Sequence, residues 1–174
     1  PKGTTEKLPV IIDIHGGGRM YGYKEINKYF CLKLAQKGFL VASINYRLAG
    51  DVLFDEQIRD IFAALTWLGK NLKDYPADMD NIFLAGDSAG GHFACVTTAV
   101  NLNKDMQKDF GVDYIGYDFN AVAAICPAVD LLSPNFLMNV NVPILLGSKS
   151  RKSPFRKYLD VNRIASKQFP PFYI

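Results

Sequence analysis

Apolar runs alternate with amphipathic stretches along almost the whole of this chain. Short apolar runs between polar residues predict strands, whereas apolar positions that recur every three or four residues predict helices. By this criterion we expect strands at residues 10–14, 39–45, 81–85 and 121–126, and helices at residues 25–37, 55–72 and 89–102. Because the two patterns alternate, they predict an α/β fold with a mostly parallel sheet and helices on both faces.

The pattern also separates two kinds of helix and two irregular stretches. The helix at 55–72 is amphipathic, with an apolar face made of Ile58, Ile61, Phe62, Leu65, Leu68 and Leu72. The helix at 89–102 is apolar nearly all round, which predicts a position inside the fold. Residues 103–118 mix charges, glycine and tyrosine and predict a surface connection. Residues 131–161 are irregular and contain three prolines.

Composition narrows the class of protein. The chain has 174 residues, 49% of them hydrophobic, which suits a single domain over residues 1–174. A formal net charge of +3 does not indicate nucleic-acid binding. No apolar run approaches the roughly 18 residues of a membrane span. The three cysteines do not have metal-binding spacing, and their odd number favours a reducing compartment, so we expect a cytoplasmic protein. We expect Cys95 and Cys126, which lie in apolar segments, to be inert core residues.

Residues 86–91 carry the first chemical motif, Gly-Asp-Ser-Ala-Gly-Gly, between an expected strand and an expected helix. The pattern G-x-S-x-G in that context describes a nucleophile elbow, a sharp turn that exposes a serine. Three small residues flank Ser88 and leave room for such a turn: Gly86, Ala89 and Gly90. The alternative is that Ser88 merely caps the helix, as serine often does.

Residues 15–18 carry the second motif, His-Gly-Gly-Gly, directly after the strand at 10–14. An apolar strand that ends in this motif is the oxyanion-hole loop of lipases and esterases. We expect the backbone N–H groups of Gly16, Gly17 and Ala89 to stabilise the oxyanion. A helix-capping serine would need neither this loop nor the small flanking residues, so the two motifs together favour Ser88 as a nucleophile.

Together with Asn45-Tyr46-Arg47-Leu48 and the segment 126–130, these motifs resemble the hormone-sensitive-lipase-like branch of the α/β-hydrolase carboxylesterases. The resemblance implies a serine hydrolase that acts on short-chain carboxylic esters through an acyl-enzyme on Ser88. It implies a small-molecule ester as partner, and no metal or organic cofactor. It also implies that several residues support the site rather than react: His15, Gly18, Gly86, Asp87 and Gly90.

The family places a triad acid and histidine after positions that correspond to the end of this chain, and strands before residue 10. We therefore expect the α/β-hydrolase domain to be incomplete at both termini. The sequence contains two histidines, His15 and His92, and both belong to other motifs. We expect His15 to orient the loop and His92 to be packed and hydrogen-bonded. Two alternatives stay open: an amidase or formamidase on the same scaffold, and a non-catalytic ligand-binding relative.

The resemblance further implies that residues 131–161 contribute to a cap over the site. Five apolar residues there either line an acyl pocket or simply pack: Phe136, Leu137, Met138, Ile144 and Leu145. Arg19, Met20 and Tyr21 follow the oxyanion loop and are candidate pocket residues. Arg19 stands where the family usually has an aromatic or apolar residue. It either recognises an acidic substrate group or is a solvated loop arginine.

Four further charged residues call for a structural interpretation. Asp13 interrupts a strand that should be buried on both faces, and a buried carboxylate needs hydrogen-bond partners. Arg47 and Asp60 resemble a paired support between a strand and a helix. Asp130, which follows the strand at 121–126, is better read as structural than as the triad acid.

Overall fold

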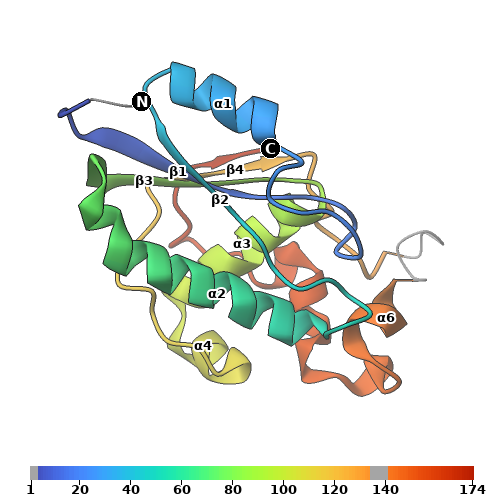
Figure 1. Ribbon diagram of the computed structural model, residues 1–174. Coiled ribbons are helices and arrows are strands. Elements are labelled where there is room, and N and C mark those ends of the chain that lie inside the picture. The colour runs from blue at the N-terminus through green and yellow to red at the C-terminus, as the bar shows by residue number, and fades with distance from the viewer. Residues whose placement is uncertain (1–3, 134–140) are drawn as a thin grey trace.

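Five parallel strands form one sheet in the computed structural model, which describes residues 4–133 and 141–174 (Figure 1). The strands are β1 (Leu8–Ile14), β2 (Leu40–Ile44), β3 (Ala77–Asp87), β4 (Ala121–Ile125) and β5 (Phe172–Tyr173). Their order across the sheet is β2-β1-β3-β4-β5, and each neighbouring pair is parallel. The predicted parallel sheet is therefore confirmed, with β3 extending further toward the N-terminus than its apolar run.

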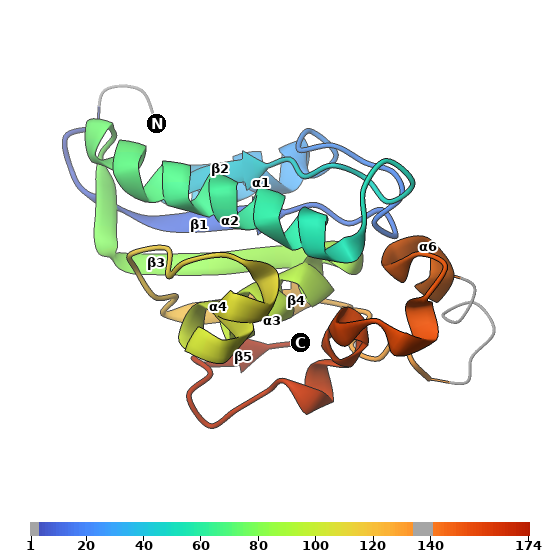
Figure 2. The same cartoon turned by 90° about the horizontal axis from the view of Figure 1, so that it is seen from below.

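Helices cover both faces of this sheet, as the alternating pattern predicts (Figures 1 and 2). Helix α1 (Lys28–Gln36) lies on one face. On the other face lie α2 (Phe54–Asn71), α3 (Ala89–Leu102) and α4 (Lys104–Phe110). Helix α6 (Val142–Leu146) and several 3-10 turns, including Pro154–Leu159, lie near the N-terminal end of α2 (Figure 2).

Helix α4 corrects one prediction, because it occupies part of the stretch expected to be a surface connection. The side chain of Asn103 accepts hydrogen bonds from the N–H groups of Asp105 and Met106, which caps the helix. Gly111 ends the helix in a left-handed conformation with φ 63°. Phe110 anchors it in the core with no exposed surface. The two capping residues were visible in the sequence, but seven residues are too few for a periodic pattern to stand out.

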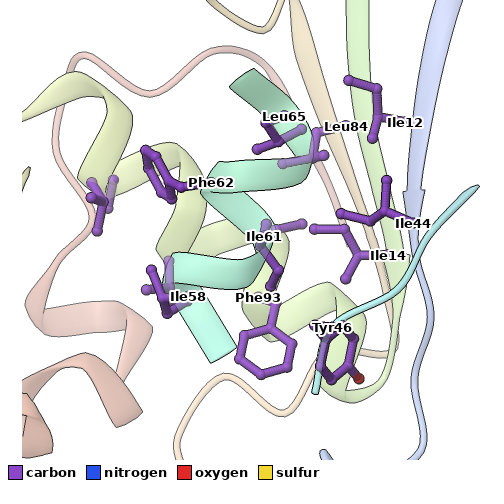
Figure 3. Close-up of a cluster of buried hydrophobic side chains, with 14 of the residues drawn as sticks. Ile12, Ile14, Ile44, Tyr46, Ile58, Ile61, Phe62, Leu65, Leu84 and Phe93 are labelled. Carbon is purple, nitrogen blue, oxygen red and sulfur yellow. The ribbon is translucent and has the colours of Figure 1, made fainter. Parts of the chain in front are cut away.

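The main core lies between the sheet and helices α2 and α3 (Figure 3). The sheet contributes Ile12, Ile14, Ile44 and Leu84, and the helices contribute Ile58, Ile61, Phe62, Leu65 and Phe93. Each such side chain, when fully buried, stabilises the fold by roughly 1.5–3 kcal/mol. Because side chains alternate along a strand, Asp13 points to the opposite face from Ile12 and Ile14, toward α1. The predicted apolar face of α2 is confirmed.

Two further expectations concern exposure. Cys95 is fully buried, but Cys126 is exposed at the end of β4 with a positive φ of 46°, so the prediction of an inert core residue is wrong for Cys126. A strand end faces loops rather than the core, and an apolar run alone does not show where the strand stops. Among the described residues, no helix is long and apolar enough to cross a membrane.

Candidate active site

Ser88 lies at the tip of a tight turn between β3 and α3, where it is exposed. Its backbone has φ 48° and ψ −111°, a conformation that costs a non-glycine residue free energy and persists only when its surroundings hold it. The N–H of Ser88 donates to the carbonyl oxygen of Ile125 at 2.9 Å, and its own carbonyl accepts from the N–H of His92 at 3.1 Å. This strained, exposed turn is the geometry that the G-x-S-x-G pattern predicts.

The small residues around Ser88 are required by the packing of α3 against two strand ends. A Cβ atom on Gly90 would lie 1.9 Å from the carbonyl oxygen of Ile14 on β1. A Cβ atom on Gly86 would lie 2.5 Å from the carbonyl carbon and oxygen of Gly90. The first turn of α3 therefore packs directly on backbone, and only glycine fits at both positions. This contact also fixes the distance between the elbow and the loop that follows β1.

The oxyanion loop begins where β1 ends, beside the elbow, because β1 and β3 pair in register with Ile14 opposite Gly86. In the part of the chain that the structure describes, no hydrogen bond uses the N–H of Gly17 or of Ala89. Ala89 is the first residue of α3, whose N–H has no partner within the helix. Both groups are therefore free to donate to a ligand.

Gly16 differs from the prediction. Its N–H donates to Oδ1 of Asp87 at 2.8 Å, and the residue is buried. An N–H directed at a carboxylate is not free to stabilise an oxyanion, so we remove Gly16 from the expected donors. Asp87, which directly precedes Ser88, instead holds the oxyanion loop next to the serine turn.

His15 fixes the oxyanion loop through its buried side chain. Its fully buried ring stacks on Tyr46 with ring centres 4.4 Å apart, and its Nδ1 lies 2.8 Å from the carbonyl oxygen of Gly16. Because a carbonyl oxygen only accepts, Nδ1 carries the proton in this contact. The hydroxyl of Tyr46 donates to the carbonyl oxygen of His15 at 2.9 Å. These contacts suit an orienting residue rather than a base.

Arg19 is not a solvated loop arginine, because only 2% of its surface is exposed. Its guanidinium carbon lies 5.4 Å from the centre of the Phe93 ring, and its Nε and one Nη have no partner among the described residues. Burial lowers the pKa of Arg19 to about 10. Its carbonyl oxygen accepts from the N–H of Ala49 and from Nε2 of Gln57, which anchors the end of the loop. Met20 and Tyr21, by contrast, are exposed.

His92 is packed as expected. It has no exposed surface, and its ring lies 5.9 Å from that of Phe54. The backbone of Tyr158 and of Leu159 faces its imidazole and raises its pKa, but burial outweighs this effect. Burial, and secondarily the charge of Arg19, lower the pKa of His92 well below 6.5. His92 is therefore a neutral core residue. No hydrogen bond joins His15 or His92 to the hydroxyl of Ser88 within the described segments.

The partners of Asp13 were not apparent from the sequence. Asp13 is 1% exposed, and its carboxyl group contacts Asn27, Ser43 and Cys31. Ser43 lies directly opposite Asp13 in the β1–β2 register, so knowledge of strand pairing would have revealed it. Asn27 precedes α1 and carried no signal in the sequence.

The other charged residues match their structural interpretation. Arg47 and Asp60 form a bidentate pair with two 2.8 Å contacts. Asp130 accepts from the N–H groups of Leu132 and Ser133, which shapes the turn after β4. In the expected cap, Leu145 is buried in the core and Ile144 is 44% exposed, whereas Phe136, Leu137 and Met138 lie outside the described residues. A pocket role for these apolar residues stays a prediction.

A parallel sheet flanked by helices, with a serine elbow after β3 and a glycine loop after β1, defines an α/β-hydrolase fold. The chain belongs to the BD-FAE family, which it matches over residues 1–174.

Named relatives agree with this assignment. Carboxylesterase NlhH of Mycobacterium tuberculosis is 31% identical over 146 residues, covering 83% of this chain and 43% of that protein. Neutral cholesterol ester hydrolase 1 of Pongo abelii is 31% identical over 140 residues, covering 78% of this chain and 33% of that protein. A crystal structure of esterase B from Lactobacillus rhamnosis with a C4-C4 tributyrin phosphonate superposes with a TM-score of 0.89 at 33% identity, covering 95% of this chain and 54% of that one. The chain thus spans less than half the length of these curated relatives.

Proposed function

We propose that this protein is a serine carboxylesterase. The observation that carries this proposal is the exposed, strained Ser88 beside two unpaired backbone N–H groups, those of Gly17 and Ala89. Ser88 attacks the ester carbonyl, the alcohol leaves, and water then hydrolyses the acyl-enzyme. Each oxyanion donor contributes roughly 3 kcal/mol to stabilising the transition state. The esterases among its relatives support the same reaction.

The proposed substrates are short-chain carboxylic esters of small molecules. Arg19, Met20 and Tyr21 border the oxyanion loop and are proposed to flank the substrate. We propose a cytoplasmic location from the unpaired cysteines, and a reaction without metal or organic cofactor. We do not assign the general base or the triad acid to any described residue, because both histidines are buried and neither forms a hydrogen bond with the hydroxyl of Ser88 in the described part of the chain.

The lack of a hydrogen bond between either histidine and Ser88 in the described residues favours one alternative. A serine elbow without a histidine in contact is also what a non-catalytic, ligand-binding relative would retain. An amidase would use the same nucleophile and donors, so only the substrate distinguishes it from an esterase. Comparing turnover of a short ester with that of the matching amide separates these two enzymes.

Labelling with a fluorophosphonate tests the nucleophile. We expect one adduct, which peptide mapping by mass spectrometry places on Ser88 and which Ser88→Ala abolishes. Ser148→Ala, at another exposed serine, is the matched control and should label normally. The 174-residue chain and the longest reading frame that contains it should be tested side by side. Labelling that survives Ser88→Ala contradicts the proposed nucleophile, and binding of esters without turnover in both forms supports the non-catalytic alternative.

A further inference from the structure

A chain of hydrogen bonds connects the buried Asp13 to the oxyanion loop. One amide, that of Asn27, serves two carboxyl groups: its Nδ2 lies 2.8 Å from Oδ1 of Asp87 and 3.3 Å from Oδ2 of Asp13. An amide nitrogen carries two hydrogens, which is enough to donate to both. The same Oδ1 of Asp87 accepts the N–H of Gly16. The order of contacts is therefore Asp13, Asn27, Asp87 and Gly16.

The hydrogens around Asp13 indicate which state its carboxyl group is in. Oγ of Ser43 lies 2.9 Å from the carbonyl oxygen of Lys24 and 3.1 Å from Oδ2 of Asp13. A hydroxyl has one hydrogen, and the carbonyl oxygen, the nearer of the two, only accepts. With that hydrogen directed at Lys24, the contact between Asp13 and Ser43 needs a hydrogen on the carboxyl group of Asp13.

The charges around Asp13 favour the same state. It has no ion-pair partner among the described residues. Burial is the largest influence on the pKa of Asp13 and raises it, and it outweighs the hydrogen bonds from Ser43, Asn27 and Cys31, which lower that pKa. The charged group that faces it from β3 is Asp87, which also raises the pKa of Asp13. On the side of α1, the thiol of Cys31 lies 3.6 Å from Oδ2 of Asp13. Burial raises the pKa of this thiol to about 11. Lys24, Glu25 and Lys28 border the adjoining groove but are exposed.

We propose that Asp13 is held as a neutral acid and that, with Asn27, it is a positioning residue for the oxyanion loop. With Asp13 neutral, Asp87 is the stronger acceptor for the amide of Asn27 and stays aligned on the N–H of Gly16. When Asp13 loses its proton to a base in the solvent, its carboxylate becomes a second negatively charged acceptor for the amide of Asn27. That charge competes with Asp87 for Asn27 and loosens the loop. The role of the loop rests on the proposed function, but the protonation state does not.

Infrared spectroscopy tests the protonation state without any activity. In protein labelled with ¹³C-aspartate, we expect a carboxylic-acid C=O band that persists at neutral pH, where ordinary aspartates with a pKa of about 3.9 are ionised. Asp13→Asn should remove the band, and Asp113→Asn, at an exposed aspartate, should keep it. A wild-type spectrum without this band at neutral pH overturns the proposed neutral acid.

Hydrogen exchange at the Gly16 amide tests the positioning role, again without activity. Asn27→Leu removes both amide donors and should abolish protection of the Gly16 N–H, whereas the neutral isostere Asp13→Asn should retain it. Unchanged protection in a folded Asn27→Leu variant overturns the positioning role. Should Asn27→Leu fail to fold, exchange in the wild type decides instead: protection must fall at alkaline pH and stay constant in Asp13→Asn.

Ester hydrolysis adds an independent measurement. Asn27→Leu should lower kcat about tenfold or more with little change in KM, because a misplaced donor weakens transition-state binding. Asp13→Asn should keep kcat near neutral pH and lose an alkaline decline that the wild type shows. If Ser88→Ala leaves hydrolysis unchanged, the proposed function fails while the infrared and exchange results still stand. If hydrolysis depends on Ser88 but not on Asn27, the positioning role fails alone.

Discussion

At the scale of single residues, backbone conformation decides which atoms are available at the candidate site. Gly17 adopts φ 104°, and a Cβ atom there would lie 2.0 Å from the carbonyl oxygen of Tyr21. The residue therefore combines a left-handed conformation with a close contact that excludes every side chain. Ser88 accepts a strained conformation instead, because the bonds to Ile125 and His92 hold it.

We predict that Gly17→Ala lowers kcat on a short ester by about a hundredfold or more, the scale of one lost oxyanion donor. The added methyl group must displace the Tyr21 carbonyl and so moves the Gly17 N–H. Gly50→Ala is the matched control, because Gly50 has φ 108° but no neighbouring atom within 4 Å of a Cβ. Both variants should lose about 1–2 kcal/mol of unfolding free energy for the left-handed conformation. Gly17→Ala should lose about 1–3 kcal/mol more, because its methyl group is overpacked against the Tyr21 carbonyl. Equal kcat values for the two would exclude a donor role for the loop at Gly17.

At the scale of secondary-structure elements, the site depends on how closely α3 approaches β1. Gly90 permits that approach, because the carbonyl oxygen of Ile14 occupies the position that a side chain at residue 90 would need. Sequence reasoning predicted β1, β2, β4, α2 and α3 well, because each is long or strongly apolar. It missed α4, where the capping residues Asn103 and Gly111 carried the signal.

We predict that Gly90→Ala destabilises the fold by about 1–3 kcal/mol, the usual cost of overpacking, and abolishes serine labelling. The helix must move away from β1, which separates Ser88 from the oxyanion loop. Urea unfolding and fluorophosphonate labelling measure the two effects. Gly111→Ala, at a left-handed position with nothing within 4 Å of a Cβ, should be destabilised but should label normally. Normal labelling of Gly90→Ala would show that the elbow does not depend on this contact.

At the scale of the whole molecule, two buried titratable residues give the folding stability opposite dependences on pH. The pKa of His92 is lowered well below 6.5, so the unfolded state binds more protons between the two pKa values. Its contribution to stability is present above the unfolded pKa and is lost as pH falls. Asp13 has a raised pKa, so its contribution is present below an unfolded pKa of about 3.9 and is lost as pH rises.

We predict that wild type loses stability relative to His92→Leu between pH 7 and pH 5, by at most about 1.4 kcal/mol per pH unit for one proton. Relative to Asp13→Asn, the wild type should instead gain stability as the pH falls over the same range. Urea unfolding of the three proteins at both pH values measures these differences. A His92→Leu difference that is independent of pH would mean that His92 does not stay neutral in the fold.

The amino-acid sequence alone determined most of the strands and helices along the chain, the elbow at Ser88 and the glycine loop. These are local demands: apolar periodicity and small residues are visible within a short window. Only the tertiary structure decided which side chains meet. It directed the N–H of Gly16 to Asp87, buried Arg19, and joined Asp13 to Asn27 and Ser43. Those contacts link residues far apart in the chain, so they depend on strand register and helix placement, which no local pattern encodes.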